Sequence, residues 1–323
     1  MSSVREREPI ADQSADDIEV VRELVELLLD RRRADKDLGQ HYLVDPSVIH
    51  RSIELAELDS DSHVLEVGPG SGTLTHFLME AGSKVTAIEL DQVAVEHLHR
   101  VHPDAIEDGR LNLIEGDALK VGWPRGLTHV VSNPPYQISS PLITKIDEYQ
   151  AKARALGDEP LRSVTLLLQE EFTSRMGMEF GLASRGPLGI NLAINWVSTL
   201  DRTVSAGSFT PHPRVRSRLV HLVPFDLMAD MGVEVDSRLV KRMVDHAFLE
   251  RRKKVRNRMK GTPRKIERVP GWTKQEWRRC AKELLAVESI EGVGSDWSEV
   301  RPEELEVEEW VLLAGELERI RQN

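Results

Sequence analysis

Short apolar segments alternate with helical stretches through the first half of this chain, and this alternation restricts its fold most strongly. In chain order the expected segments are a strand at 63–67, a helix at 74–81, a strand at 84–89, a helix at 93–101 and strands at 111–115 and 129–132. A helix that connects two strands returns the chain to the same starting edge, so the strands become parallel. The pattern therefore predicts an α/β fold with a mostly parallel sheet covered by helices on both faces.

The rest of the chain divides by its periodicity. Residues 1–34 are expected to be an N-terminal extension, with a polar lead and a surface helix packed on the main domain. Further strands are expected at 164–168 and 218–223, a strand or buried helix at 188–196, and a solvated loop at 150–160. Only helical periodicity follows Pro224, which places a domain boundary near residue 226. The predicted domains are 1–34, 35–225 and 226–323, the last a smaller helical domain.

Composition excludes several classes of protein. Cys280 is the single cysteine, so no internal disulfide can form, and no apolar run reaches the roughly 18 residues of a membrane helix. The N-terminus lacks the apolar core of a secretion signal, so a cytoplasmic protein with no membrane partner is expected. No histidines form an i, i+4 pair with a glutamate between them, and His97 and His99 are expected on different sides of a helix, so no metal site is expected. Four tryptophans are expected in the core of the small domain: Trp272, Trp277, Trp297 and Trp310.

A glycine-rich loop from Gly68 to Gly72 follows the first strand and opens a helix near Thr73. Glycines let a backbone approach a ligand closely, and the first amides of a helix are free to donate. A phosphate-binding P-loop needs Lys and Ser or Thr after its last glycine, and a dinucleotide fingerprint needs its third glycine one position beyond Gly72. The remaining match is the Glu-x-Gly-x-Gly-x-Gly pattern of S-adenosylmethionine enzymes. Gly68 and Gly70 are therefore predicted to contact this cofactor.

Acidic side chains stand at the ends of the next two strands. Glu89 ends the strand at 84–89, and Asp117 follows the strand at 111–115, beside Ala118. One such acid is most often an ordinary surface residue, but successive acids at the same edge of a sheet favour a ligand site. Glu89 is predicted to hold a ribose diol, and Asp117 to accept a hydrogen bond from an adenine amino group.

The segment Asn133-Pro134-Pro135-Tyr136 follows the strand at 129–132. The prolines could simply end that strand, but the exocyclic amine of adenine is a poor nucleophile and needs help. The side-chain oxygen of Asn133 and a backbone carbonyl of the proline pair can accept its hydrogens, while Tyr136 stacks on the base. The base must leave its stack to enter. These four residues are predicted to catalyse methyl transfer to a planar amine or amide, of which adenine is one case.

Positive charge is concentrated in one segment. The chain has a formal charge of -11, yet residues 241–268 contain 12 basic and three acidic side chains, a local charge of +9. The run from Arg251 to Lys260 is expected to continue the helix that begins near Leu239. A solvated surface helix would explain an isolated basic run, but in so acidic a chain the segment favours a polyanionic partner.

Together these motifs resemble the KsgA-type ribosomal RNA adenine dimethyltransferases, which are related to the erythromycin-resistance methyltransferases. The resemblance extends from about Leu38 to Arg258 and covers several motifs in order: Gly39-Gln40-His41-Tyr42-Leu43, the glycine loop, the segment from Asn133 to Pro141, residues 209–217 and residues 248–254. It implies a Rossmann-like class I methyltransferase fold with S-adenosylmethionine as the cofactor. His41 and Pro134 stand where the family commonly has Asn and Leu.

Carried over by position, the resemblance implies a role for further residues. The cofactor site would include Gln40, His41, Leu43, Gly68, Gly70, Glu89, Asp117, Ala118 and Asn133. Phe209 would face the target base, and rRNA would be bound by Arg251, Arg252, Lys253, Lys254, Arg256 and Arg258. The implied reaction is N6,N6-dimethylation of two adjacent adenosines near the 3′ end of small-subunit rRNA, in a precursor of the small ribosomal subunit. A monomer is expected, because the site needs no second chain.

Two alternatives stay open from sequence. The chain could act mainly as a ribosome-assembly factor, through binding to a pre-ribosomal particle rather than through chemistry. It could also methylate adenine in DNA, since the catalytic segment would serve both nucleic acids. The second alternative is disfavoured, because about 100 helical residues after the main domain leave little room for a base-reading domain.

Overall fold

The structure, a computed structural model, describes residues 14–31 and 40–323. The chain divides into two compact units. The first contains the described residues up to Glu170 together with Leu200–Leu222, and the second contains Glu171–Thr199 and Val223–Asn323. The second unit thus resumes close to the boundary predicted near residue 226, and it also includes 171–199, which the sequence analysis assigns to the preceding domain.

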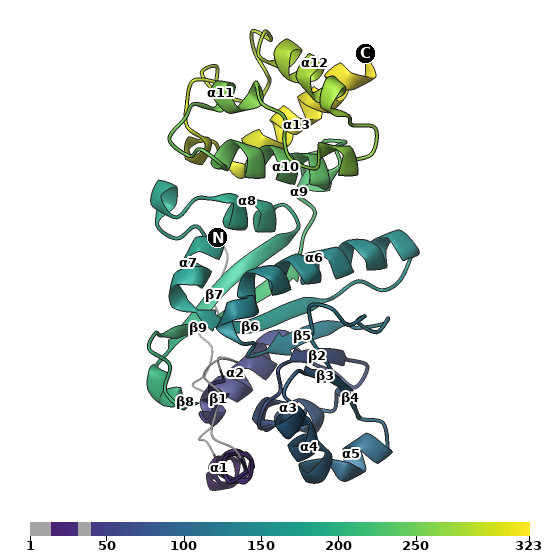
Figure 1. The fold of residues 1–323 in the computed structure, drawn as a ribbon, viewed down its shortest axis with the longest axis vertical. Helices are drawn as coiled ribbons and strands as arrows, with labels where there is room; N and C mark the ends of the chain where they lie inside the picture. The colour runs from purple at the N-terminus through teal and green to yellow at the C-terminus, as the bar shows by residue number, and fades with distance from the viewer. Residues whose placement is uncertain (1–13, 32–39) are drawn as a thin grey trace, which may run out of the picture. The chain divides into compact units, whose positions relative to one another are not determined.

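A seven-stranded sheet with the order β4-β3-β2-β5-β6-β9-β7 forms the centre of the fold (Figure 1). The strands are β2 (His63–Val67), β3 (Lys84–Glu89), β4 (Leu111–Glu115), β5 (His129–Ser132), β6 (Ser163–Gln169), β7 (Trp196–Val204) and β9 (Ser217–Pro224). The first five are parallel, and β9 runs antiparallel to β6. The predicted α/β fold with a mostly parallel sheet is confirmed, and the strands expected between residues 63 and 132 lie where they were predicted.

The register of the parallel strands brings their carboxyl ends to one edge. Val67 of β2 pairs with Ile88 of β3, and Glu89 of β3 pairs with Glu115 of β4. Backbone hydrogen bonds continue this alignment past the strand ends, from the Gly68 amide to the Ile88 carbonyl at 2.9 Å. The loops after β2, β3, β4 and β5 consequently leave the sheet side by side.

Helices cover both faces of the parallel part of the sheet. They are α1 (Ala15–Leu29), α2 (Pro46–Ala56), α3 (Thr73–Glu80), α4 (Gln92–Val101), α5 (Pro103–Glu107) and α6 (Ser139–Leu156), with one 3₁₀ turn, η1 (Tyr136–Ile138). α1 contacts α2, α3 and α4, which confirms the expected surface helix, whereas α6 runs along the opposite face (Figure 1). The polar lead expected before α1 lies almost wholly outside the described residues.

The prediction of a solvated loop at residues 150–160 is wrong for residues 150–156, which belong to α6. α6 continues to Leu156, and the Gln150 side chain is buried rather than solvated. Its amide oxygen accepts from the Leu161 amide at 2.8 Å, and its amide nitrogen donates to the Leu161 carbonyl at 3.4 Å. A buried glutamine that bonds to a backbone group and a glutamine exposed to solvent look the same in the sequence. The sequence alone therefore could not distinguish these two cases.

The second unit is helical apart from its share of β7 and β9. Its elements are α7 (Glu170–Met176, which begins at the junction), η2 (Gly181–Ala183), α8 (Pro187–Ala193), α9 (Leu227–Asp230), α10 (Ser237–Phe248), α11 (Val255–Met259), η4 (Ile266–Arg268), α12 (Lys274–Leu284), η5 (Pro302–Glu304) and α13 (Val307–Gln322). All four tryptophans predicted for this core are buried in it. Among the described residues, no helix is both long and apolar enough to cross a membrane.

The basic run does not continue α10 as one helix, and that prediction is wrong. α10 ends at Phe248, and the chain turns before the short helix α11 begins at Val255. The Val255 amide donates to the Val300 carbonyl at 2.9 Å, and the Val255 and Met259 side chains are buried in the core. Contacts with a distant segment therefore override the local helical periodicity.

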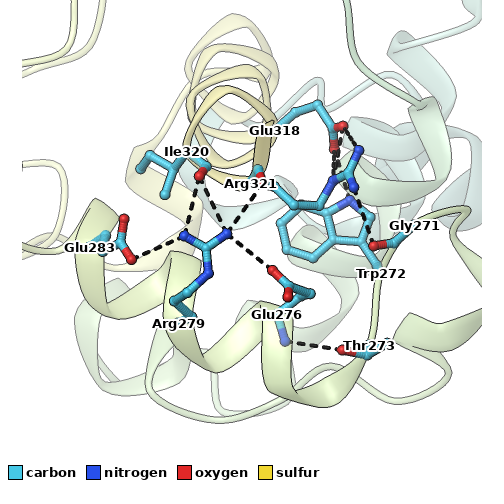
Figure 2. Close-up of polar contacts among 9 residues, drawn as sticks. All are labelled: Gly271, Trp272, Thr273, Glu276, Arg279, Glu283, Glu318, Ile320 and Arg321. Atoms are coloured by element: carbon cyan, nitrogen blue, oxygen red, sulfur yellow. Dashed lines mark hydrogen bonds and ion pairs between the residues drawn. The ribbon is translucent and has the colours of Figure 1, made fainter. Parts of the chain in front are cut away.

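Arg279 of α12 holds the last turn of α13 (Figure 2). Its guanidinium donates to the backbone carbonyls of Ile320 at 3.4 Å and Arg321 at 3.3 Å, and it pairs with Glu276 and Glu283 on its own helix. The last carbonyls of a helix lack partners inside it, so a cation at this position satisfies them and complements the helix dipole. Arg279 thus joins α12 to α13.

We expect Arg279→Ala to lower the midpoint of thermal unfolding, because the final carbonyls of α13 would lose their donor. Arg278→Ala is the matched control, since Arg278 is the exposed neighbour on the same helix. Circular dichroism at 222 nm measures both variants. Equal midpoints for the two variants would contradict this role of Arg279.

Candidate functional site

A cavity lies in the first unit, at the carboxyl edge of β2, β3 and β5. Its lining includes these predicted site residues: Gln40, His41, Leu43, Gly68, Gly70, Glu89, Asn133, Pro134, Pro135 and Tyr136. It also includes residues that were not predicted, notably Tyr42 and Glu66. The described lining contains two carboxylates and no lysine or arginine. Such a cavity favours a ligand that carries positive charge.

The glycine loop can follow its path only because its glycines have no side chains at crowded points. Gly68 has φ of 71°, Gly70 of 55° and Gly72 of 79°, all in the left-handed region. A Cβ atom on Gly70 would lie 2.9 Å from Cε1 of Tyr42, and one on Gly68 would lie 3.2 Å from Cδ of Pro135. The loop therefore packs tightly between the N-terminal motif and the proline pair.

Glu89 connects the glycine loop with the chain that follows β3. Its Oε2 accepts from the Gly70 amide at 3.0 Å, while its Oε1 accepts from the amides of Leu90 and Asp91 at 2.7 and 2.8 Å. The carboxyl group is buried, and burial raises its pKa while these three amides lower it. Oε2 keeps a lone pair for a ligand hydroxyl, because a carboxylate oxygen can accept two hydrogen bonds.

Glu66 is the second acid of the cavity and lies on β2. Its side chain is buried, and the Thr75 hydroxyl donates to its Oε2 at 2.6 Å. Burial raises the pKa of Glu66 to about 8, with a smaller contribution in the same direction from the nearby Glu89. A group with this pKa changes its protonation state close to neutral pH, as groups in functional sites often do.

The N-terminal motif closes one side of the cavity through a chain of side-chain contacts. The Tyr42 hydroxyl donates to Oε1 of Gln40 at 2.9 Å, and Nε2 of Gln40 donates to Oδ2 of Asp91 at 2.8 Å. Two short strands, β1 (Tyr42–Leu43) and β8 (Phe209–Thr210), pair antiparallel and hold this motif. Residues far apart in sequence thereby fix the position of Gln40 over the start of α4.

Asn133 is oriented by the same motif. Its Nδ2 donates to the His41 carbonyl at 3.3 Å, which leaves Oδ1 as the free acceptor of the amide. The Pro135 carbonyl accepts from the Ile138 amide at 3.0 Å, whereas the Pro134 carbonyl accepts no hydrogen bond from the described residues. Two oxygens at the cavity, on Asn133 and Pro134, therefore accept no hydrogen bond from the part of the chain that the structure describes.

Tyr136 forms a fixed aromatic wall beside these acceptors. Its hydroxyl hydrogen-bonds with Oγ of Ser217 at 2.5 Å, and its ring stacks on the His41 ring with centroids 6.0 Å apart. Burial raises the pKa of the Tyr136 hydroxyl, so this group stays neutral. The ring is held at its tip and on one face.

Three predicted site residues do not line the cavity. Asp117 and Ala118 follow β4, and the Lys120 ammonium at 3.0 Å holds the pKa of Asp117 below its usual range. Both lie next to Gly116, whose amide donates to the Glu89 carbonyl at 2.7 Å, so they share the edge of the sheet but not the lining. Phe209 is fully buried in the hydrophobic core, where its ring offers no face to a base.

The predicted RNA-binding side chains lie in the second unit, and most of them contact acidic groups. The pairs join Arg251 to Glu303 at 3.4 Å, Lys253 to Glu250 at 2.8 Å, Lys254 to Glu299 at 3.0 Å, Arg256 to Glu299 and Arg258 to Glu250. Arg252 is exposed and pairs with none of the described residues. Exposed pairs of this kind contribute little to stability, so a phosphate can replace the carboxylate.

Sequence reasoning missed four residues that build the site. Glu66 is part of the Glu-x-Gly-x-Gly-x-Gly pattern, and Tyr42 is part of the N-terminal motif, so both had a signal. Asp91 caps α4 by accepting from the Val93 amide. Its position directly before a predicted helix was a sequence signal for this cap. Ser217 is the last residue of the motif at 209–217, but no local pattern indicates its contact with Tyr136, because the two residues lie 81 positions apart.

Glu66 should make the stability of the protein fall as pH rises. Its pKa is about 8 in the folded state against 4.5 for an ordinary glutamate, so between these values the folded chain keeps a proton that the unfolded chain has released. The free energy of unfolding therefore falls from about pH 4.5 until the loss is complete above about pH 8. The loss is on the order of a few kcal/mol, since one pKa unit corresponds to about 1.4 kcal/mol.

Glu66→Gln should remove this part of the pH dependence. Chemical denaturation at about pH 5 and about pH 9 measures it. The exposed Glu96→Gln is the control and should keep the wild-type slope. A Glu66→Gln variant with the wild-type pH dependence would show that Glu66 does not hold its proton in the folded state.

Comparisons with known proteins agree with this geometry. A profile of the family described as ribosomal RNA adenine dimethylase matches residues 31–270. The chain is 32% identical to a ribosomal RNA small subunit methyltransferase A from Pseudomonas putida, across 89% of this chain and 96% of that relative. It is 37% identical to a probable ribosomal RNA small subunit methyltransferase A from Haloquadratum walsbyi, across 72% of this chain and 75% of the relative.

Among solved structures, a dimethyladenosine transferase from Plasmodium falciparum superposes with a TM-score of 0.67 at 25% identity. The match covers 86% of this chain and 98% of the other. The cavity at the carboxyl edge of a class I methyltransferase sheet, the profile match and these relatives lead to one conclusion. The chain belongs to the ribosomal RNA adenine dimethylase family.

Proposed function

We propose that this protein transfers methyl groups from S-adenosylmethionine to the N6 atoms of two adjacent adenosines near the 3′ end of small-subunit rRNA, yielding dimethyladenosine. The observation that carries the proposal is the pair of oxygens on Asn133 and Pro134, beside the Tyr136 ring, that accept no hydrogen bond from any described residue. Family membership supplies the substrate class. The names of the relatives support the small ribosomal subunit as the site of the reaction.

The residues of the cavity fit S-adenosylmethionine. This molecule carries a sulfonium and an ammonium charge, and the described lining supplies the acidic groups of Glu89 and Glu66 without a competing cation. The positive charge of the ligand favours the ionised form of Glu66, which otherwise holds its proton up to a pKa of about 8. The glycine loop packs against Pro135 and Tyr42, where a Cβ atom on Gly68 or Gly70 would collide, so its backbone forms one wall of the cavity. When bound, the cofactor supplies an electrophilic methyl group.

Each wall of the cavity has a binding task in this proposal. The free lone pair of Glu89 accepts from a ribose hydroxyl, and the backbone of the glycine loop packs along the amino-acid end of the cofactor. Gln40, His41 and Leu43 cover it from the N-terminal motif. Asp117 and Ala118 contact the adenine ring from the loop after β4. Neither residue lines the cavity in this structure, so the loop must move closer to the cavity when the cofactor binds.

Asn133 and Pro134 prepare the nucleophile. The lone pair of the adenine amine is delocalised into the ring, so it attacks only when the nitrogen becomes tetrahedral. Oδ1 of Asn133 and the Pro134 carbonyl each accept one N–H and favour that geometry. No strong base is needed, because the amine proton becomes acidic once the methyl group has transferred. The prolines lack N–H groups and fix φ, which keeps the carbonyls in place.

Tyr136 positions the base. Its ring is held by Ser217 and His41, so it offers a rigid face on which an extruded adenine can stack. A base inside a duplex cannot reach this wall, so the target adenosine must be unpaired or flipped. The cations from Arg251 to Arg258 then bind the rRNA backbone by exchanging their glutamate partners for phosphates.

We expect Asn133→Ala to reduce methyl transfer at least about a hundredfold while cofactor binding stays within a few-fold of wild type. The substitution removes one of two acceptors for the adenine amine but leaves the glycine loop and Glu89 in place. The assay transfers labelled methyl from S-adenosylmethionine to small ribosomal subunits that lack the modification. Mass spectrometry of the digested nucleosides identifies the product.

Dimethyladenosine in the rRNA of the wild-type reaction would support the proposal, and label that enters only protein or DNA would refute it. Isothermal titration with S-adenosylmethionine tests cofactor binding separately. Wild-type turnover by Asn133→Ala would refute the catalytic role of this residue.

Gly70→Ala should weaken S-adenosylmethionine binding by about tenfold or more, which corresponds to roughly 1.4 kcal/mol. The added Cβ would lie 2.9 Å from the Tyr42 ring and would displace the N-terminal motif. Gly82→Ala is the matched control, because Gly82 has a φ of 87° but no atom within 4 Å of the added Cβ. Both variants place a side chain in the left-handed region, so equal loss of affinity would show that the close approach to Tyr42 is unimportant.

A further inference from the structure

Three large apolar side chains are exposed in or beside the basic segment of the second unit. Leu249 belongs to this segment at residues 241–268, and Phe180 and Leu182 lie on a loop that Arg251 contacts. Phe180 is 70% exposed, Leu182 50% and Leu249 54%. Leu249 ends α10, two residues before Arg251. We refer to Phe180, Leu182, Leu249, Arg251 and Arg252 as the Phe180 surface. Exposed apolar groups beside cations are typical of a binding surface rather than of a solvated one.

The loop that carries Phe180 is held by its own hydrogen bonds. The Phe180 amide donates to Oγ of Ser184 at 2.9 Å, and the Ser184 hydroxyl donates to the Gly181 carbonyl at 3.2 Å. Met178, two residues before Phe180, anchors the loop because its side chain packs against the core of the unit. Its backbone has a φ of 51°. The backbone is thus fixed while the Phe180 ring stays outside the core.

The loop is also fastened to the basic segment. Nη2 of Arg251 donates to the Leu182 carbonyl at 2.5 Å and to the Ala183 carbonyl at 3.3 Å. Arg185, at the end of the loop, donates to the carbonyls of Glu303 and Leu305 and pairs with Glu306 at 2.7 Å. The Arg251 guanidinium therefore places the loop that carries Phe180 and Leu182 beside the cations of the basic segment.

We infer that the Phe180 surface binds an unpaired strand of the substrate RNA, with a base stacked on the Phe180 ring and the neighbouring phosphates on Arg251 and Arg252. This inference rests on the proposed function, which makes RNA the substrate. Aromatic rings bind bases of any sequence through their faces, while arginines contact the backbone.

The surface fits a single strand better than a duplex. In an A-form duplex the bases are stacked on each other and present only their edges, so an exposed ring finds no base face. A single strand exposes base faces and phosphates together. Of the two cations of the Phe180 surface, Arg252, which has no partner among the described residues, is more available to a phosphate than Arg251, which pairs with Glu303.

Fluorescence anisotropy with a labelled single-stranded oligoadenylate RNA of about 12 nucleotides, and with a matched RNA duplex, tests this inference. Phe180→Ala should weaken single-strand binding by about tenfold, and Phe180→Tyr should restore it, because a tyrosine ring also stacks. Leu156→Ala in the first unit, a leucine 53% exposed, is the control and should bind as wild type does.

Salt dependence separates stacking from phosphate contact. Phe180→Ala should leave the slope of log K against log salt concentration unchanged, while Arg252→Ala should reduce its magnitude by about one. Wild-type affinity in Phe180→Ala would assign this surface to a partner other than RNA and overturn the inference. So would an equal loss of affinity for the duplex.

The outcomes for the two proposals are distinguishable, because anisotropy reads binding and not methyl transfer. A protein that methylates rRNA, and whose Phe180→Ala variant binds RNA as tightly as wild type, refutes only the inference about the surface. A protein that never methylates rRNA, yet loses single-strand affinity on Phe180→Ala, refutes the proposed reaction and supports the surface.

Discussion

The buried carboxylate of Glu89 is the contact on which the cavity depends. β3 lies between β2 and β4, so an acid at its end can reach the loops on both sides. Its oxygens accept from Gly70 in one loop and from Asp91 at the start of α4. Asp91 in turn accepts from Gln40 of the N-terminal motif. One carboxylate thus orders three segments of the chain, and the backbone amides offset part of the cost of its burial, which still raises its pKa.

Burying a second acid beside the first has a cost that the groups around it do not offset. Glu66 receives a hydrogen bond from Thr75, and no lysine or arginine stands among the described lining residues to balance either charge. The group therefore holds a proton to a pKa of about 8. A cationic ligand would reverse this preference, because it favours the ionised form. The same feature that lowers the stability of the fold thus raises its affinity for the proposed cofactor.

Sequence was sufficient where local pattern and final environment coincide. The strands from β2 to β5 are short and mostly apolar because helices cover both faces of the parallel sheet. The rule that ligands bind at the carboxyl edge placed Glu89 and Asn133 at one site. Sequence failed where a distant partner decides. The Val255 amide donates to the Val300 carbonyl, and the basic run therefore does not continue α10. The Leu161 amide donates to the Gln150 side chain, which is therefore buried in α6 rather than exposed on a loop. Phe209 was placed by resemblance, which carries no information on burial.

The charge pattern of the basic segment suits selective rather than general binding of nucleic acid. Glu250, Glu299 and Glu303 contact five of the six cations predicted to bind RNA, and the whole chain has a charge of -11, so the field that would attract any polyanion from a distance is weakened. An RNA must come close enough to displace these carboxylates, and each exchange of carboxylate for phosphate gains little by itself. Discrimination then depends on contacts that do not involve charge. Apolar side chains on a loop already fixed by its own hydrogen bonds can supply them with little loss of conformational freedom on binding.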